Sequence, residues 1–225
     1  MKHADLRGGQ TDERFSADGA MRLADARERY FAAYGFDAGG YRARHVHLRV
    51  AGMALTLPNV QARQAALPYH DVHHILTGYA PATSTTPIGD PAWHGEAELA
   101  AWEFGVQRTA LGQWEVWLVN SYAVVIGLAR CPGKVVRAYL RGCSSDTLYG
   151  QPIDAGRLDH QPLAQLRSQL GLDRASAPAS PLRLLRLGAL ATLALATVGV
   201  FTLGVVLPLA AVQSLRAAFR NGVRS

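Results

Sequence analysis

The C-terminal part of the chain contains an apolar run, Leu187–Val212, of 26 consecutive residues without a charged side chain. As one helix this run would be about 39 Å long, whereas the hydrocarbon core of a bilayer is about 30 Å thick. Arg183 and Arg186 precede the run, and no acidic residue follows Asp173. Residues 182–225 are therefore predicted to form a transmembrane or membrane-inserted helix with basic flanks.

A second interpretation of the same run, as a buried core helix or helical pair, stays open. Several Gly, Ala and Thr residues interrupt the run, and Pro208 would kink a membrane span. The orientation is also open, because the flanking arginines are similar in number on the two sides. The sequence predicts membrane attachment without deciding whether the segment crosses the bilayer or only inserts.

The formal net charge of +6 is concentrated around the apolar run, which favours anionic lipid as the partner. A nucleic-acid-binding protein would show a basic face interleaved with aromatic residues, and the sequence shows none, so no nucleic-acid partner is expected. The first residues, Met1–Ala24, lack the apolar segment of a signal peptide, and Cys131 and Cys143 make no disulfide framework. The folded domain is expected on the cytoplasmic side.

The predicted fold class is mainly α, a helical domain with the C-terminal membrane helix described above. Residues 1–19 are polar and expected to be disordered, 20–173 form the domain, and 174–181 are a linker rich in Ala, Ser and Pro. The alternation over 45–50 predicts one short strand as a minor β element. Helices are expected over Ala20–Tyr34, Asn59–Ala66, Pro68–Thr77 (ending at Gly78), Pro91–Phe104 (capped by Asp90 and closed by Gly105), Trp114–Ala129, Lys134–Leu140 and Leu163–Leu170.

The segment His70-Asp71-Val72-His73-His74 places three metal-binding side chains on one turn of a predicted helix. At 100° per residue, His70 and His74 point within about 40° of each other, and Asp71 lies about 60° from His74. Imidazoles combined with carboxylates suit Zn²⁺, Fe²⁺ or Mn²⁺ better than Mg²⁺ or Ca²⁺. The pattern predicts a divalent metal site, with zinc as the first expectation; His73 is either a partner of the ligands, a proton carrier or a surface residue.

The next predicted helix offers Glu96 as a further ligand. Its neighbour Gly95 allows another backbone to approach closely, and Trp93 and Trp102 supply aromatic surroundings. Glu103, seven residues on, shares the face of Glu96, whereas Glu98 points elsewhere. The alternative is that all three glutamates are solvated.

These residues resemble the signature of the coenzyme Q biosynthesis protein 4 family, His-Asp-x-x-His followed by Glu. The matching text is Tyr-His-Asp-Val-His-His-Ile-Leu-Thr-Gly-Tyr over 69–79 and Gly-Glu-Ala-Glu-Leu over 95–99, and the resemblance extends from about residue 30 to 172. It departs from the family in the spacing before Glu96: 21 residues, Ile75–Gly95, stand where about eleven are usual, an excess that an exposed loop over 81–89 can absorb. Asp90 is the fallback ligand.

The resemblance implies His70, Asp71, His74 and Glu96 as metal ligands, with Asp71 or His73 moving protons. It implies a ubiquinone biosynthesis protein that acts at the membrane on a polyprenylated aromatic intermediate. The activity would be metal-assisted oxidative decarboxylation, in which a ring hydroxyl replaces the ring carboxyl, or organisation of the other ubiquinone-biosynthesis enzymes, or both. The implied partners are the polyprenylated quinone precursor, membrane lipid and those enzymes, and a homodimer is left open.

Two other classes of function fit the same residues. His70-Asp71-Val72-His73-His74 differs from the zincin pattern His-Glu-x-x-His by one methylene group, so a metal-dependent hydrolase with Asp71 as its base is one alternative. A non-catalytic scaffold that binds quinone lipids, with a merely structural histidine cluster, is the other.

Overall fold

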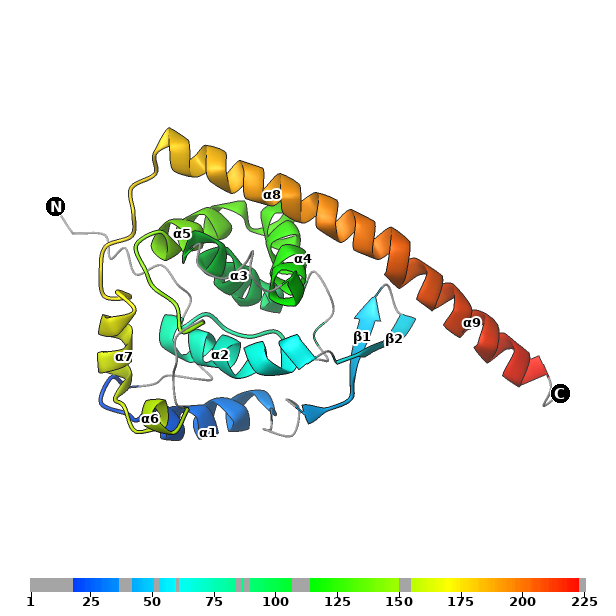
Figure 1. Ribbon diagram of the computed structural model, residues 1–225, viewed down its shortest axis with the longest axis horizontal. Helices are drawn as coiled ribbons and strands as arrows, with labels where there is room; N and C mark the ends of the chain where they lie inside the picture. Colours follow the sequence, from blue (N-terminus) through cyan, green and yellow to red (C-terminus); the bar gives the residue numbers. More distant parts are fainter. Residues whose placement is uncertain are drawn as a thin grey trace.

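The computed structural model describes residues 18–36, 42–50, 53–59, 61–83, 86, 90–106, 114–149 and 155–222. Within these residues the fold is mainly helical, with one two-stranded hairpin and a long C-terminal apolar helix, which confirms the predicted fold class (Figure 1). The disorder predicted for 1–19 falls almost wholly outside the described residues. The linker over 174–180 has no helix or strand.

The described elements are helices and a single β-hairpin, which lies between α1 and α2 in the sequence. Strands β1 (His45–Val50) and β2 (Met53–Pro58) pair antiparallel, with His45 opposite Pro58, so the predicted strand has a partner that the sequence pattern did not indicate. The helices of the domain are α1 (Leu23–Tyr34), α2 (Gln61–Thr77), the 3₁₀ turn η2 (Pro91–Trp93), α3 (His94–Val106), α4 (Trp114–Arg130), α5 (Pro132–Gly142), α6 (Ala155–Asp159) and α7 (Leu163–Gln169).

Helix α3 is the centre of the core, and its residues from Ala97 to Val106 are all buried. It packs closely on α5 because each helix presents a glycine to the other. A Cβ added to Gly105 would collide with the carbonyl oxygen of Tyr139, and one added to Gly142 would collide with that of Trp102. Gly105 therefore does not end the helix, as predicted from sequence; it lies inside α3 and permits contact between two backbones.

Helix α2 carries the histidine segment on one continuous helix. Pro68, predicted to separate two helices, lies inside it, so the proline removes one backbone hydrogen bond without interrupting the helix. The helix ends at Thr77, and Gly78 follows with φ +79°, a left-handed conformation that glycine adopts without steric cost. This confirms the predicted end at Gly78, and it turns the chain back toward the helix.

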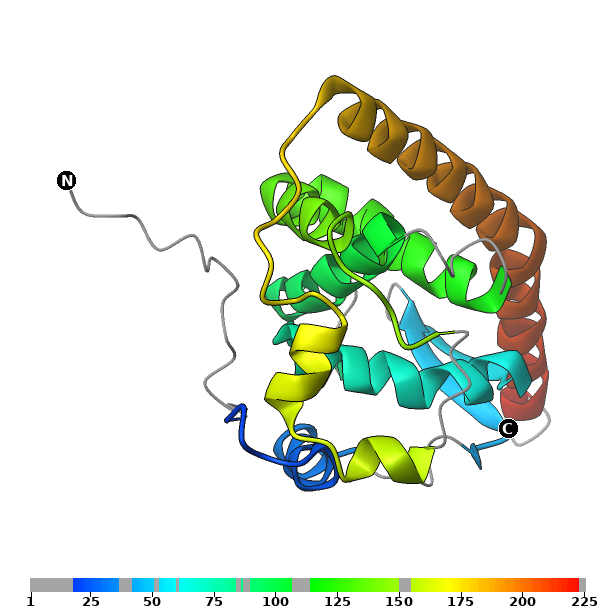
Figure 2. The same ribbon diagram turned by 60° about the vertical axis from the view of Figure 1, so that its left-hand side comes forward.

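The C-terminal helix, Pro181–Gly222, consists of α8 (Pro181–Phe201), the π-helical turn η3 (Thr202–Val206) and α9 (Leu207–Gly222). Residues Pro181–Ser214 are long and apolar enough to cross a membrane, and only 11% of their most apolar stretch is buried. The π turn precedes Pro208, whose ring would clash with the carbonyl of Gly204 in regular α-helix, so the wider turn relieves that clash. Figures 1 and 2 show this helix running along one side of the domain, beside α4.

Candidate metal centre

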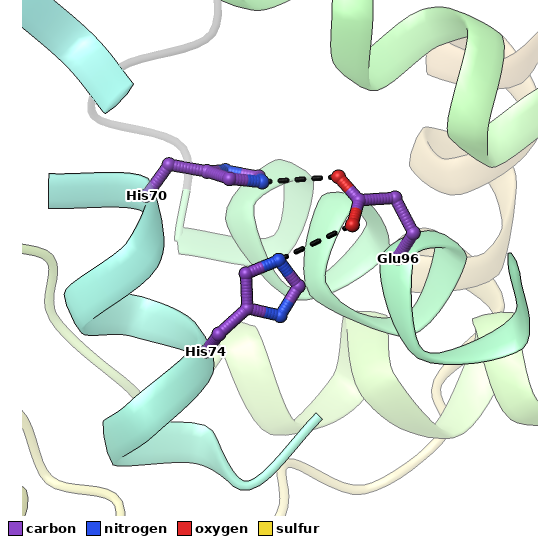
Figure 3. Close-up of side chains that lie close together, drawn as sticks. All are labelled: His70, His74 and Glu96. Atoms are coloured by element: carbon purple, nitrogen blue, oxygen red, sulfur yellow. Dashed lines mark hydrogen bonds and ion pairs between the residues drawn. The ribbon is translucent and has the colours of Figure 1, made fainter. Parts of the chain in front are cut away.

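Helices α2 and α3 bring His70, His74 and Glu96 together (Figure 3). Nε2 of His70 lies 3.0 Å from Oε1 of Glu96, and Nε2 of His74 lies 3.2 Å from Oε2 of the same carboxylate. The two histidines are one helical turn apart on α2, and Glu96 stands in the first turn of α3. One ligand atom from each residue lies within 4.8 Å of the others, so the three side chains could hold one metal ion.

The backbone that follows α2 passes directly over the start of α3. A Cβ added to Gly95 would lie 2.6 Å from the backbone nitrogen of Ala80, so only glycine fits here. This approach allows the N–H of Ala82 to donate to Oε2 of Glu96 at 3.2 Å. The predicted role of Gly95, close approach of another backbone, is confirmed.

Both imidazoles are oriented by a second contact through Nδ1. Nδ1 of His74 donates to the carbonyl oxygen of Tyr79 at 2.8 Å, and Nδ1 of His70 lies 3.4 Å from Oε1 of Glu103. A histidine held at Nδ1 by an acceptor presents the lone pair of Nε2, which is how metal-binding histidines are usually positioned. In both residues Nε2 is the atom that faces Glu96.

Glu103 and His73 form a buried layer behind the three candidate ligands. Oε1 of Glu103 lies 2.9 Å from Nδ1 of His73, and its Oε2 accepts a hydrogen bond from the side-chain amide of Asn120 on α4. Nε2 of His73 accepts from the backbone N–H of Leu148 at 3.1 Å, so the proton of a neutral His73 is on Nδ1. The ring of Tyr149 packs edge-on against His73, with 4.8 Å between centroids.

Burial and the contacts above shift the pKa values of these groups in opposite directions. Burial lowers the pKa of His70, but Glu103 and Glu96 more than offset this and raise it well above the usual value. Burial favours protonation of Glu96 and Glu103, yet the neighbouring imidazoles of His74, His70 and His73 hold both carboxyl pKa values far below the usual range. Burial lowers the pKa of His73. The carboxylates are thus ionised at neutral pH beside a readily protonated His70, and a cation could replace that proton.

The structure brings together three of the four predicted ligands. Asp71 does not belong to the group formed by His70, His74 and Glu96. The fallback ligand Asp90 instead caps η2, where its side chain accepts from the N–H of Ala92 at 2.8 Å, as its position before Pro91 predicts.

Sequence reasoning assigns no role in the site to Glu103, which contacts His70 and His73, or to Asn120, which donates to Glu103. The available signal for Glu103 was its position seven residues after Glu96, on the same face of the helix. Asn120 carried no such signal, because it lies in an apolar segment on another helix. His73 was predicted as a partner of the ligands, a proton carrier or a surface residue; it is fully buried, which excludes the surface alternative.

The donor set fits a divalent cation. Two ligand atoms of a tetrahedral ion at about 2.0–2.1 Å are separated by about 3.3 Å. Each imidazole lies at a similar distance, 3.0 or 3.2 Å, from a different oxygen of Glu96, and one ligand atom from each of the three residues lies within 4.8 Å of the others. Two imidazoles and one carboxylate are typical of catalytic zinc sites and of non-haem iron sites, both of which keep positions open for water or substrate. His70, His74 and Glu96 would therefore hold the ion and leave room for further ligands.

Fold and site together define a mainly helical protein with a candidate two-histidine, one-carboxylate metal centre and one helix long enough to cross a membrane. Comparisons of the chain with protein families, with curated proteins and with solved structures find no match in any of the three. The resemblance to the coenzyme Q biosynthesis protein 4 family thus rests on the motif and its surroundings alone.

Proposed function

We propose that the protein is a metal-dependent enzyme of ubiquinone biosynthesis that removes the ring carboxyl group of a polyprenylated aromatic acid at the membrane. The observation that carries the proposal is the convergence of His70, His74 and Glu96. In addition, Nδ1 of His74 donates to the carbonyl oxygen of Tyr79, and Nδ1 of His70 lies near the carboxylate of Glu103. The motif that these residues share with the coenzyme Q biosynthesis protein 4 family supplies the substrate class.

The chemistry of the centre suits loss of a carboxyl group. A bound divalent cation would polarise a ring carboxylate or phenol and stabilise the negative charge that develops as carbon dioxide leaves. In the overall reaction the ring acid, one dioxygen, two electrons from a cellular reductant and two protons give a ring hydroxyl, carbon dioxide and water. His70, His74 and Glu96 would hold the metal ion, and Glu103 orients the imidazole of His70. Asp71 and His73 are the candidates for moving protons.

The C-terminal helix supports a lipid substrate. A polyprenyl chain partitions into the bilayer, so an enzyme attached there reaches the ring without extracting the whole molecule into water. In this proposal the domain lies on the cytoplasmic side, and the other ubiquinone-biosynthesis enzymes are its partners.

Complementation with mass spectrometry of quinone-pathway lipids tests the proposal. Cells that lack this protein are supplied with the wild type, with Glu96→Gln or with Glu98→Gln. Glu98 is the matched control because it lies on the same helix, is itself buried, and pairs with Lys134 at 3.8 Å. The wild type and Glu98→Gln are expected to restore the quinone, whereas Glu96→Gln leaves a carboxylated precursor to accumulate.

The other outcomes of this experiment contradict the proposal in different ways. An unchanged lipid profile in the deletion strain removes any role in quinone synthesis. If Glu96→Gln fully restores the quinone, the function is that of a non-catalytic scaffold, because binding of partner enzymes does not need the carboxylate. A peptidase activity of the purified protein that a chelator abolishes favours the hydrolase.

A further inference from the structure

Exposed apolar side chains are concentrated on the C-terminal helix. Among the residues whose side-chain exposure the structure describes, every exposed large apolar side chain except Val119 belongs to Pro181–Val212. Leu185, Val200 and Leu203 are 72%, 74% and 69% exposed, values that soluble surfaces rarely combine on one helix. We expect these exposed apolar side chains to contact an apolar partner.

The opposite face of the same helix is attached to the domain over much of its length. Leu187 and Ala194 are buried, and Nε1 of Trp117 on α4 donates to Oγ1 of Thr197 at 3.1 Å. The hydroxyl groups of Tyr122 and Thr202 also share a hydrogen bond. Further along, α9 contacts β2, and Figure 1 draws the hairpin beside the helix.

These contacts conflict with a perpendicular crossing of the bilayer. Thr197 lies near the middle of the apolar stretch Pro181–Ser214, so a crossing would bring α4 to the depth of the hydrocarbon core. Asn120 of α4 donates to the buried carboxyl group of Glu103, which also contacts His73, and a cluster of ionisable and polar side chains at that depth is unfavourable. If α4 stayed outside the bilayer, a crossing would require α8 to separate from α4, and the surfaces that these two helices now bury against each other would be exposed.

We propose that the helix Pro181–Ser214 lies in the plane of the membrane, with its outer face inserted among the lipids of one leaflet and the domain docked on its inner face. In-plane helices normally need a polar face toward water. Here the domain covers that side, which explains why the helix can be apolar on both faces.

Charge supports an anionic bilayer surface as the partner. Arg183 and Arg186 precede the apolar run and Arg216 and Arg220 follow it, while no acidic residue occurs after Asp173. An in-plane helix presents both basic ends to the headgroups of the same leaflet. This arrangement goes beyond the proposed function and holds whether or not the metal centre is catalytic.

Labelling of single cysteines tests the orientation in sealed membrane vesicles from cells that express the full chain. Cys131 and Cys143 are first replaced by serine, and Ala179→Cys or Ser214→Cys then places one exposed thiol at either end of the helix. A membrane-impermeant maleimide is expected to label both positions from the same side. Labelling of the two positions from opposite sides would overturn the proposal, as would recovery of the protein in the soluble fraction.

Depth measurements distinguish an in-plane helix from a hairpin that enters and leaves the same face. Nitroxides are attached at Leu185→Cys, Val200→Cys and Leu207→Cys of the protein bound to vesicles of phosphatidylcholine and phosphatidylglycerol, with Ser168→Cys on α7 as the control that stays in water. The three helix positions are expected at one shallow depth. A Val200 position much deeper than the other two indicates a hairpin, and a steady gradient indicates a crossing; either result contradicts the proposal.

Discussion

The carbonyl oxygen of Tyr79 accepts a hydrogen bond of 2.8 Å from Nδ1 of His74. Because a carbonyl can only accept, the proton of His74 is on Nδ1 and the lone pair of a neutral ring is on Nε2, 3.2 Å from Glu96. The contact is local: α2 ends, Gly78 adopts φ +79°, and the chain returns to the last turn of its own helix. The end of one helix thus orients a candidate metal ligand.

The turn at Gly78 can be tested separately from the fold. Gly78→Ala places a side chain at a positive φ and is expected to cost about 1–2 kcal/mol in the free energy of unfolding, and to weaken metal binding about tenfold by moving Tyr79. Gly35→Ala is the matched control, because Gly35 has φ +69° and, like Gly78, no atom within 4 Å of an added Cβ. It should lose similar stability in thermal unfolding but keep its zinc affinity in calorimetric titration. Equal affinities in the two variants would contradict the role of Tyr79.

Metal binding should depend on three side chains. Chelator-treated protein is expected to bind one Zn²⁺ per chain, with an affinity that Glu96→Gln lowers about a hundredfold or more, since it removes a ligand, and that Glu98→Gln leaves unchanged. Asp71→Asn is expected to change the affinity little, because Asp71 does not belong to the group of three. Titration calorimetry of the four proteins measures this, and a loss in Asp71→Asn as large as in Glu96→Gln would make Asp71 a fourth ligand.

Metal affinity should rise with pH. Although burial opposes it, Glu103 and Glu96 raise the pKa of His70 well above its usual value, so a proton occupies the imidazole at neutral pH until an ion displaces it. Calorimetry in buffers of different ionisation enthalpy should therefore show protons released on binding, and fewer of them at higher pH. Binding that is independent of pH between 6 and about 9 would contradict this assignment.

The pH dependence of stability without metal has the opposite sign for the imidazole and the carboxylates. His70, with a raised folded-state pKa, contributes stability in full below about pH 6.5, and loses it as the pH rises through that folded value. Glu96 and Glu103, with lowered pKa values, contribute above about pH 4.3 and lose that contribution as the pH falls. The unfolding temperature of chelator-treated protein should fall both in acid and at alkaline pH. An increase in unfolding temperature below pH 4 would exclude the assignment for the carboxylates.

Glu103 should matter for stability as well as for the site. Glu103→Gln removes a buried charge that contacts two imidazoles and the amide of Asn120, and is expected to cost about 3 kcal/mol, or roughly 6–12 °C in unfolding temperature. Glu98→Gln, on the same helix but more weakly paired, should lower the unfolding temperature much less. A Glu103→Gln variant as stable as the wild type would show that the buried pairs contribute nothing.

Close packing of α3 on α5 predicts a large effect of a single methyl group. Gly105→Ala and Gly142→Ala each place a Cβ against a carbonyl oxygen of the other helix, and each is expected to cost about 3 kcal/mol. Gly188→Ala is the control, because nothing lies within 4 Å of its added Cβ and alanine favours helix; it should be neutral or stabilising by up to about 1 kcal/mol. Thermal unfolding in detergent measures the three variants, and equal effects of all three would contradict close packing.

Fold class and several helix ends could be predicted from the sequence because they depend on neighbouring residues. The ends at Gly35 and Gly78 follow from the positive φ that glycine allows, and the cap at Asp90 follows from a side chain that reaches its own backbone. For Gly105 the same local logic predicts a helix end, and this prediction is wrong because the residue lies inside α3. Its reason lies in α5, more than thirty residues away, whose backbone leaves no room for a side chain.

That His70 and His74 share one face of a helix follows from the sequence, because helical spacing alone decides it. The packing of α2 on α3 and α4 brings Glu96 into the group and places Glu103 and Asn120 behind it, whereas Asp71 is outside it. Likewise the apolar run predicts a lipid-facing helix, but its attachment to α4 through Trp117 and Thr197 joins residues 80 positions apart. Such contacts depend on how helices pack against one another, and the periodicity of a single helix carries no information about the register of its neighbours.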